Sequence, residues 1–426
     1  MKKRVAVFPA GSEIGLEINR ALKYSTYFEL FGFSSVDDHA AFVFKNYVDG
    51  IPFYTKPDFI EKLNEALVEH QIDFLYPALD DLLLYLTEHQ SEIKAKVITS
   101  AVDTIRICRS KIKTYEYFKD EYFVPRSYES IDDVDTYPVF IKPDIGQGSQ
   151  GAKLIKDRKE LEIAFEENPN IVICEYLSGE EYTIDCFTDF KGEFKVCKMR
   201  NRNRVRTGIS VNSKSLKTPQ EVIDIARIIN EKLTLNGAWF FQLKKNAKGE
   251  FRLLEIAPRI AGTMGLSRNT GVNYPLLTLF NAMEKDVAII PNNYEIEVDR
   301  AFISRFKTNL DYNTVYVDLD DTIIVNEKVN TFLMMYLYQC VNEGKKLVLI
   351  TKHIRVIEET LGKNKVPMSL FDEVIHLSPT DKKSEYVKDK KAIFIDDSFA
   401  ERMDVAKNCG IPVFDLSEVE ALIDWK

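Results

Sequence analysis

The sequence predicts an α/β protein that is divided into several domains. Short apolar runs alternate with helical patterns along all 426 residues, which is typical of α/β architecture. At roughly 100 to 200 residues per domain, this length predicts two to four domains. The third observation is that glycine-rich or acidic segments directly follow several of the apolar runs, where α/β folds place their binding sites.

Composition narrows the classes of function. Lys and Arg number 57 against 66 Asp and Glu, a net charge of −9, and 45% of the residues are hydrophobic. This acidic balance argues against a nucleic-acid or anionic-membrane partner, and no window offers the roughly 18 apolar residues of a membrane span. The six cysteines form no CxxC pair and the five histidines are scattered, so we expect reduced thiols, no zinc site and a cytoplasmic location.

Strand and helix patterns place three domains, at residues 1–100, 101–304 and 305–426. In the first, residues 4–8 and 74–77 read as buried strands, 9–15 as a turn and 16–23 as a helix, which indicates a small Rossmann-like unit. Strands of the second are expected at residues 139–142, 171–175, 182–187, 239–243 and 253–256, with an antiparallel hairpin turn at 246–249. The third restarts the α/β pattern with strands at residues 315–317, 347–350 and 392–395. Residues 291–293 and 307–313 are the candidate linkers.

Two glycine-rich segments are candidate phosphate-binding loops. Gly11-Ser-Glu-Ile-Gly15 follows a strand and opens a helix, but its spacing is not that of a dinucleotide fingerprint, so we interpret it as a tight turn. Gly146-Gln-Gly148-Ser149-Gln-Gly151 matches that fingerprint literally, yet a strand rather than a helix follows it. A glycine-rich loop between antiparallel strands can close over phosphates with its N–H groups, with the Ser149 hydroxyl as a further donor, although an ordinary flexible hairpin has the same pattern.

Further motifs occur in order around this loop. They are Ser110-Lys111, Phe140-Ile-Lys142-Pro143, Glu175-Tyr176-Leu177, Gly179-Glu-Glu181-Tyr182, Gln242 and Glu255-Ile-Ala-Pro-Arg259. Together they resemble the ATP-grasp family, over residues 1 to 300, on the branch of carbamoyl-phosphate synthase large subunits and carboxylate-amine ligases. The resemblance implies an N-terminal Rossmann-like pre-ATP-grasp domain followed by an α+β ATP-grasp domain.

The resemblance also implies residue roles and cofactors. Lys111, Lys142 and the loop glycines (Gly146, Gly148, Gly151) with Ser149 would hold the ATP phosphates. Glu175, Tyr176 and Leu177 would contact adenine, and Glu181 the ribose. Gln242 and Glu255 would lie at Mg²⁺, which Mn²⁺ could replace and which prefers oxygen ligands. Arg259 would stabilise charge on the transferred phosphoryl group.

The chain departs from the family pattern at two positions, and an arginine cluster is the candidate substrate site. Many relatives have Glu-x-Asn-Pro-Arg, with Asn as a metal ligand, where this chain has Ala257, and Ser110 replaces a frequent Asp. For a substrate carboxylate or phosphate, Arg206 is the first candidate and Arg202 the second, with Gly262 and Thr263 nearby. A solvated basic strand edge would explain the arginine cluster equally well.

A second set of motifs lies in the last 120 residues. Asp318-Leu-Asp320-Asp321-Thr322 follows an apolar strand, a second strand ends in Thr351, Lys382-Lys383 comes next, and a third strand ends in Asp396-Asp397. These motifs resemble the haloacid dehalogenase-like phosphohydrolase superfamily, which implies a Rossmannoid domain. The short segment between Thr322 and Lys352 has no room for a large cap domain.

This second resemblance implies a Mg²⁺-dependent phosphatase. Asp318 would be the nucleophile that forms an aspartyl-phosphate, and Asp320 would protonate the leaving group and then activate water. Thr351 and Lys383, with Lys382 as the alternative lysine, would bind phosphoryl oxygens. Asp396 and Asp397, with Asp318 and the backbone of Asp320, would hold Mg²⁺.

Three hypotheses about function remain. The first is a bifunctional enzyme in which a ligase that joins a small-molecule carboxylate and an amine through an acyl-phosphate is fused to the phosphatase. In the second, the ATP-grasp half is a small-molecule kinase whose product is a phosphorylated metabolite. In the third, that half senses nucleotide and regulates the phosphatase. A homo-oligomer is compatible with each hypothesis.

Overall fold

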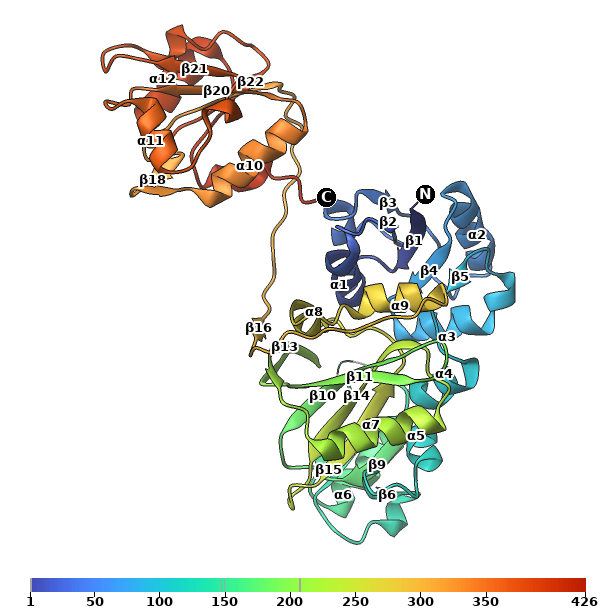
Figure 1. Ribbon diagram of the computed structural model, residues 1–426. Helices are drawn as coiled ribbons and strands as arrows, with labels where there is room; N and C mark the ends of the chain where they lie inside the picture. The colour runs from blue at the N-terminus through green and yellow to red at the C-terminus, as the bar shows by residue number, and fades with distance from the viewer. Residues whose placement is uncertain (1, 147, 149, 207) are drawn as a thin grey trace. The chain divides into compact units, whose positions relative to one another are not determined.

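A computed structural model describes residues 2–146, 148, 150–206 and 208–426 of the chain. The chain divides into two compact units, Met1–Phe302 and Ile303–Lys426 (Figure 1). Residues 300–312 form no helix or strand. This stretch contains the predicted linker 307–313 except for its last residue.

The first hundred residues form a parallel sheet of strand order β3-β2-β1-β4-β5. Its strands are β1 (Lys3–Phe8), β2 (Phe28–Phe33), β3 (Asn46–Val48), β4 (Phe74–Pro77) and β5 (Lys96–Val97). The helices of this region are α1 (Glu13–Leu22), α2 (Phe59–Glu69) and α3 (Asp80–Glu88). Helix α1 begins three residues before the predicted helix because the Ser12 hydroxyl accepts a hydrogen bond from the N–H of Gly15 and caps it.

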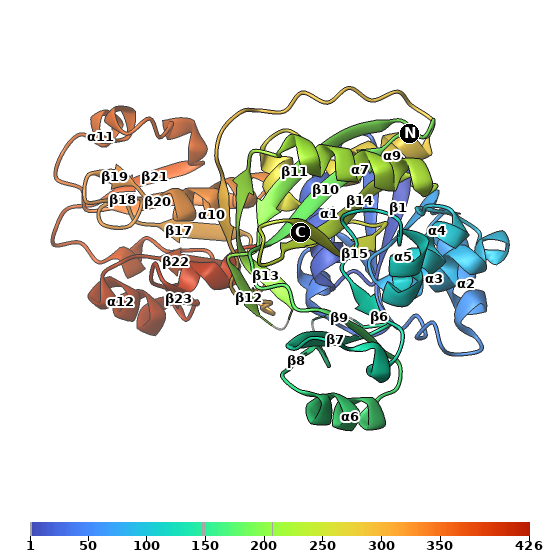
Figure 2. The same cartoon turned by 90° about the horizontal axis from the view of Figure 1, so that it is seen from below.

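A small antiparallel sheet of order β6-β9-β7-β8 follows. It contains β6 (Ser127–Tyr128), β7 (Val139–Pro143), β8 (Lys153–Ile155) and β9 (Ile171–Glu175), preceded by α4 (Val102–Arg109) and α5 (Lys111–Tyr117). Helix α6 (Arg158–Glu167) packs on it through Leu161 and Ala164 (Figure 2). The glycine loop at 146–151 connects the antiparallel strands β7 and β8, as the sequence predicts.

A large antiparallel sheet completes the first unit, in the order β12-β13-β11-β10-β14-β15 with β16 beside β13. Its strands are β10 (Glu181–Thr188), β11 (Phe194–Asn201), β12 (Arg204–Arg206), β13 (Ile209–Leu216), β14 (Gly237–Lys245), β15 (Phe251–Ala257) and β16 (Glu297–Asp299). Helices α7 (Gln220–Lys232), α8 (Gly265–Asn269) and α9 (Tyr274–Ala282) belong to the same region. The sheet faces the small sheet across the cavity described below.

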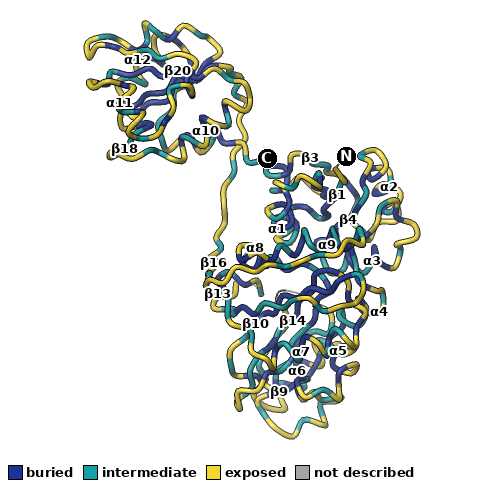
Figure 3. Tube along the Cα trace, viewed as in Figure 1, coloured by how far each residue is buried: buried dark blue, intermediate teal, exposed yellow. Residues whose placement is uncertain are grey.

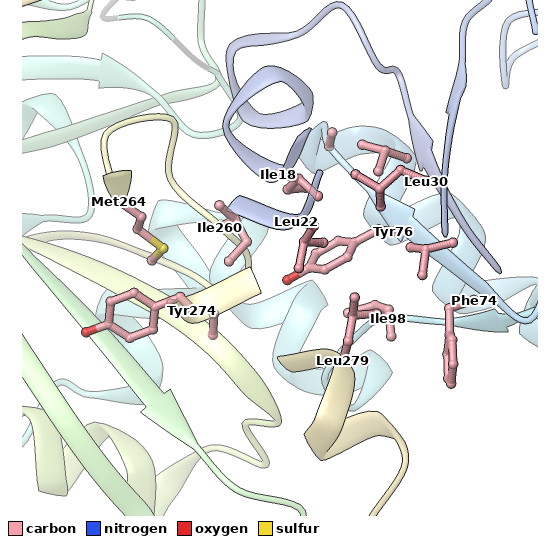
Figure 4. Close-up of a cluster of buried hydrophobic side chains, with 14 of the residues drawn as sticks. Ile18, Leu22, Leu30, Phe74, Tyr76, Ile98, Ile260, Met264, Tyr274 and Leu279 are labelled. Carbon is pink, nitrogen blue, oxygen red and sulfur yellow. The ribbon is translucent and has the colours of Figure 1, made fainter. Parts of the chain in front are cut away.

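One hydrophobic core joins the parallel sheet to the large sheet. Ile18 and Leu22 of α1 and Tyr76 of β4 lie in the same buried cluster as Tyr274 and Leu279 of α9 (Figure 4). Residues 1–100 therefore belong to the same compact unit as residues 101–302, and the separate domain expected over 1–100 shares its core with the next. This packing places the carboxyl ends of the first strands beside the larger sheet.

The second unit contains a parallel sheet of order β21-β20-β17-β22-β23. Its strands are β17 (Thr314–Val317), β20 (Lys346–Thr351), β21 (Glu373–His376), β22 (Ala392–Ile395) and β23 (Val413–Phe414), and the helices are α10 (Thr331–Asn342), α11 (Ile357–Lys363) and α12 (Phe399–Cys409). The segment where the sequence leaves no room for a cap contains α10, β20 and a hairpin of β18 (Ile324–Val325) and β19 (Lys328–Val329). The central strands β17, β20 and β22 are buried, and solvent reaches mainly loops and helix faces (Figure 3).

Two expectations from composition concern the whole chain. All six cysteines are free thiols, and Cys174, Cys186, Cys340 and Cys409 are buried. Within the described residues, no helix is both long and apolar enough to cross a membrane.

Candidate active sites

A cavity of about 280 Å³ lies between the small sheet and the large sheet of the first unit. Its wall comes from α5, β7, β9, β10, β14 and β15, which are distant in sequence. Most of the residues predicted to bind nucleotide or metal line it, together with Arg202, a predicted substrate residue: Lys111, Lys142, Gly146, Gly148, Glu175, Tyr176, Leu177, Glu181, Gln242 and Glu255. The fold thus brings together motifs that the sequence spreads over 145 positions.

Lys142 is a buried cation at one wall of this cavity. Its ammonium group donates hydrogen bonds to the hydroxyl of Tyr115, at 2.6 Å, and to the carbonyl of Leu254, at 3.0 Å. Burial lowers the pKa of Lys142 below its usual value, because the charged form loses hydration. Such a cation gains from a phosphate ligand, since the interior screens their attraction less than water does.

Lys111 supplies a second cation at the start of α5. The Ser110 side chain caps this helix by accepting from the N–H of Lys113, and it donates to both oxygens of Asp144. The ammonium of Lys111 donates to the carbonyl of Asp144, and burial lowers its pKa. Ser110 therefore connects the helix to the residue that follows β7.

Two glycines lie very close to other residues of the protein: Gly208, which approaches the glycine loop, and Gly151 within that loop. Gly208 has a φ of +73°, and a Cβ there would lie 2.2 Å from Cα of Gly148. Gly151 has a φ of +71°, and its Cβ would be 2.9 Å from the Pro143 ring. Both positions therefore require glycine. Ser149, predicted as an added phosphate donor, lies outside the described residues.

Oxygen donors line the cavity on the large sheet. Gln242 and Glu255 are directly paired across β14 and β15, so their side chains are on the same face. Glu181 of β10 forms an ion pair of 2.7 Å with Arg202. Burial lowers the pKa of the Arg202 guanidinium. The amide and carboxylate oxygens of Gln242 and Glu255 suit Mg²⁺, so these residues fit the predicted ion.

Arg259 does not reach the main cavity, and lines a smaller one of about 40 Å³ together with Lys111, Gly146 and Glu255. Its guanidinium group is held by Asp80, the first residue of α3. Ala257 also borders the small cavity, and its side chain belongs to the core shared with the parallel sheet.

Three predicted substrate residues lie apart from the cavity. We expected Arg206 to have priority over Arg202, but Arg202 lines the cavity, whereas Arg206 is exposed on the edge strand β12. Gly262 packs against Glu13 of α1, and Thr263 is buried just before α8. Their predicted role in substrate binding stays a prediction.

A second cluster lies at the carboxyl ends of the central strands of the second unit. Lys383 donates to Asp318 Oδ1 and to Asp396 Oδ2, both at 2.6 Å, and all three side chains are buried. Asp318 follows β17 and Asp396 follows β22, and these strands are parallel neighbours. Lys383, rather than the exposed Lys382, is the lysine in this cluster.

The charges of this cluster oppose one another. Burial raises the pKa of Asp318 from 3.8 to about 7, with a contribution from the neighbouring Asp396 and an opposing one from Lys383. Burial also raises the pKa of Asp396. Although burial alone would lower the pKa of Lys383, the two carboxylates outweigh it and raise that pKa. A divalent cation would relieve the repulsion between the carboxylates.

The carboxylates fit such a cation. Asp318, Asp396 and Asp397 each offer an oxygen within 4.8 Å of the others. Among the described residues, this group of three does not include the Asp320 carboxylate, which contacts His353. Thr351 is fully buried, and its hydroxyl accepts from the N–H of His353. Hard oxygen donors of this kind suit Mg²⁺.

Several residues that contact the predicted site residues were not predicted from the sequence. Tyr115, Asp80 and His353 contact Lys142, Arg259 and Asp320 respectively. Asp80 and His353 follow the carboxyl ends of parallel strands, which is a usable signal. Nothing in the spacing of Tyr115 distinguishes it from a core aromatic.

Comparisons with known proteins support an ATP-grasp assignment. Residues 167–301 match the profile of a family described as "ATP-grasp in the biosynthetic pathway with Ter operon". A 3-methyl-D-ornithine–L-lysine ligase of Methanosarcina mazei is 27% identical over 156 residues, 36% of this chain and 39% of the relative. The matched stretch thus spans well under half of that curated relative.

Solved structures show the same fold. The biotin carboxylase domain of Hydrogenobacter thermophilus 2-oxoglutarate carboxylase, in complex with ADP, its magnesium salt and bicarbonate, aligns with a TM-score of 0.58 at 15% identity, over 70% of this chain and 74% of that one. An L-amino acid ligase of Bacillus licheniformis aligns with a TM-score of 0.51 at 19% identity, over 66% and 74%. The chain therefore contains a mixed α/β fold of the ATP-grasp kind.

Proposed function

We propose that the first unit is an ATP-dependent ligase that joins a small-molecule carboxylate to an amine through an acyl-phosphate. The observation that supports this most is that one cavity is lined by the partly buried Lys111 and the buried Lys142 together with Gln242 and Glu255. Cations together with metal-binding oxygens in one cavity suit a nucleoside triphosphate. The name of the curated relative supports substrates of the amino-acid class.

Each wall has a proposed role in the reaction. Lys111, Lys142 and the glycine loop bind phosphate oxygens, while Glu175 to Leu177 hold adenine and Glu181 the ribose. Gln242 and Glu255 hold Mg²⁺, which would neutralise charge on the phosphates. An oxygen of the substrate carboxylate bonds to the γ-phosphorus as the bond to ADP breaks. The amine nitrogen then bonds to the carbonyl carbon, loses a proton, and phosphate leaves with the C–O electron pair.

A screen by mass spectrometry tests this proposal. Asp318→Asn protein, in which the second site should be silent, is incubated with Mg²⁺-ATP and a pool of amino acids and other carboxylates. We expect ADP, phosphate and a product equal to two metabolites joined with loss of water, none of which Glu255→Gln protein should form. A product heavier by one phosphoryl group would favour the kinase hypothesis. ATP binding without turnover would favour the sensor.

We further propose that the second unit is a Mg²⁺-dependent phosphohydrolase. The supporting observation is the buried Lys383 between Asp318 and Asp396, beside the exposed Asp397. An Asp318 oxygen bonds to phosphorus while the ester bond breaks, and the leaving oxygen takes a proton from Asp320. Water then attacks the aspartyl-phosphate, gives a proton to Asp320 and releases phosphate.

Two variants separate the activities. Asp318→Asn should abolish the Mg²⁺-dependent hydrolysis of phosphomonoesters and leave ATP turnover in the first unit unchanged. Glu255→Gln should have the opposite effect. Loss of both activities in either variant would contradict the assignment of two independent sites.

A further inference from the structure

The imidazole ring of the buried residue His353 contacts the carboxylate of Asp320. Nδ1 of His353 is 2.8 Å from Oδ1 and 2.9 Å from Oδ2 of Asp320. The His353 side chain is 8% exposed, whereas that of Asp320 is 53% exposed. One edge of the carboxylate is therefore held by the protein, and the remainder is open to an incoming molecule.

The second ring nitrogen of His353 also has a partner. Nε2 is 2.7 Å from the hydroxyl oxygen of Thr360 in α11. An ionised carboxylate only accepts hydrogen bonds, so Nδ1 donates to Asp320, and in the neutral ring Nε2 accepts from Thr360. The ring cannot turn without losing both contacts, so its orientation is fixed from both sides.

The backbone of His353 is held as well. Its N–H donates to the Thr351 hydroxyl at 3.2 Å, and its carbonyl accepts from Nε2 of His376 at 2.6 Å, at the end of β21. Thr351 ends β20, and Asp320 lies just beyond the adjacent parallel strand β17. His353 thus links the end of one strand to the proposed acid at the end of the next.

We propose that His353 is a positioning residue for proton transfer by Asp320, an inference that rests on the phosphohydrolase function proposed above. The Nδ1–H group lies within hydrogen-bond distance of both carboxyl oxygens, so it fixes the plane of the group and leaves its outer edge, which solvent reaches, to carry the transferred proton. When the bond between phosphorus and the leaving oxygen breaks, its electron pair stays on that oxygen, which takes the proton from Asp320. His353 itself neither gains nor loses a proton.

The demand for this proton depends on the leaving group. An alkoxide is a strong base and needs protonation as it departs, whereas p-nitrophenolate leaves readily without it. A residue that positions the acid should therefore matter for alkyl phosphates and hardly for p-nitrophenyl phosphate. A residue that only supports the fold should affect both esters alike.

The experiment measures kcat and KM of the full chain with Mg²⁺ on an alkyl phosphate and on p-nitrophenyl phosphate. His353→Leu should lower kcat on the alkyl ester by about 100-fold, the lower range for general acid catalysis, with little change in KM or on the aryl ester. His353→Asn should restore part of this loss, because its amide N–H can donate to Asp320. Thr360→Val should show a smaller loss of the same kind, and Thr360→Ser, which keeps the hydroxyl, none.

Other outcomes overturn the inference in distinguishable ways. Equal losses on the two esters in His353→Leu and Thr360→Val would assign His353 a structural role. Unchanged kcat on the alkyl ester would assign it none. Hydrolysis of neither ester by the wild-type protein would reject the phosphohydrolase function, and this inference with it.

Discussion

The guanidinium group of Arg259 and the carboxylate of Asp80, 179 positions apart in sequence, form a two-point hydrogen-bonded pair. Nε and Nη2 of Arg259 donate to Oδ1 and Oδ2 of Asp80 at 2.5 and 2.6 Å. Burial would raise the pKa of Asp80, but the charge of Arg259 outweighs it and lowers that pKa. The pair fixes Arg259 at a small cavity that Glu255 also lines.

Breaking this pair should slow ATP turnover. In Asp80→Asn, the guanidinium loses its counter-charge and should shift toward Glu255, so we expect kcat to fall on the order of tenfold or more. Asp81→Asn, which breaks the neighbouring pair with Arg109, is the matched control and should have a small effect. Steady-state kinetics with ATP measure both. A wild-type kcat in Asp80→Asn would contradict a role for Arg259 in the reaction.

Lys142 should contribute to ATP binding. Replacing it with Met removes a buried cation but keeps most of its volume, and loss of one charge-assisted contact should raise the Kd for ATP on the order of tenfold. Lys113→Met, at an exposed position two residues after Lys111 in α5, is the control. Titration calorimetry measures both constants. Equal affinities in the two variants would remove Lys142 from the nucleotide site.

The buried pair of Arg200 and Asp185 should stabilise the large sheet only as a pair. Arg200 donates to both carboxylate oxygens of Asp185 at 2.9 and 3.1 Å, and both residues are at most 1% exposed. Arg200→Met leaves a buried charge without its partner and should cost about 3–5 kcal/mol in the free energy of unfolding. Chemical denaturation measures this loss, and Asp185→Leu combined with Arg200→Met should cost less. A larger loss in the double variant would contradict this account.

Without metal, the second unit should lose stability as pH rises from about 4 to 7. Folding raises the pKa of Asp318 from 3.8 to about 7, so in this range the folded chain holds a proton that the unfolded chain has released. Unfolding then releases that proton, and stability falls by up to about 1.4 kcal/mol per pH unit. Denaturation in EDTA across this range should show the slope in wild type and a weaker one in Asp318→Asn. Equal slopes would assign the proton to another group.

Much of the fold follows from short-range patterns, and parts of the sites do not. The strand at β17 and the carboxylates after it are readable because a buried strand needs an apolar run and its polar neighbours must follow at the sheet edge. Gly208 requires glycine because another segment passes 2.2 Å from where its Cβ would be, a contact between distant parts of the chain. That Arg202 rather than Arg206 lines the cavity likewise depends on which of them precedes the edge strand β12, which composition does not reveal.

The most direct test of the proposed ligase follows oxygen atoms. With the carboxylate found in the screen and labelled with oxygen-18 in its carboxyl group, the reaction is run with Mg²⁺-ATP, the amine and Asp318→Asn protein. An acyl-phosphate pathway predicts that each inorganic phosphate released contains one oxygen-18 atom, because the substrate oxygen that bonds to the γ-phosphorus leaves with it. Ligation that yields unlabelled phosphate, or a stable phosphorylated product in place of ligation, would contradict the account.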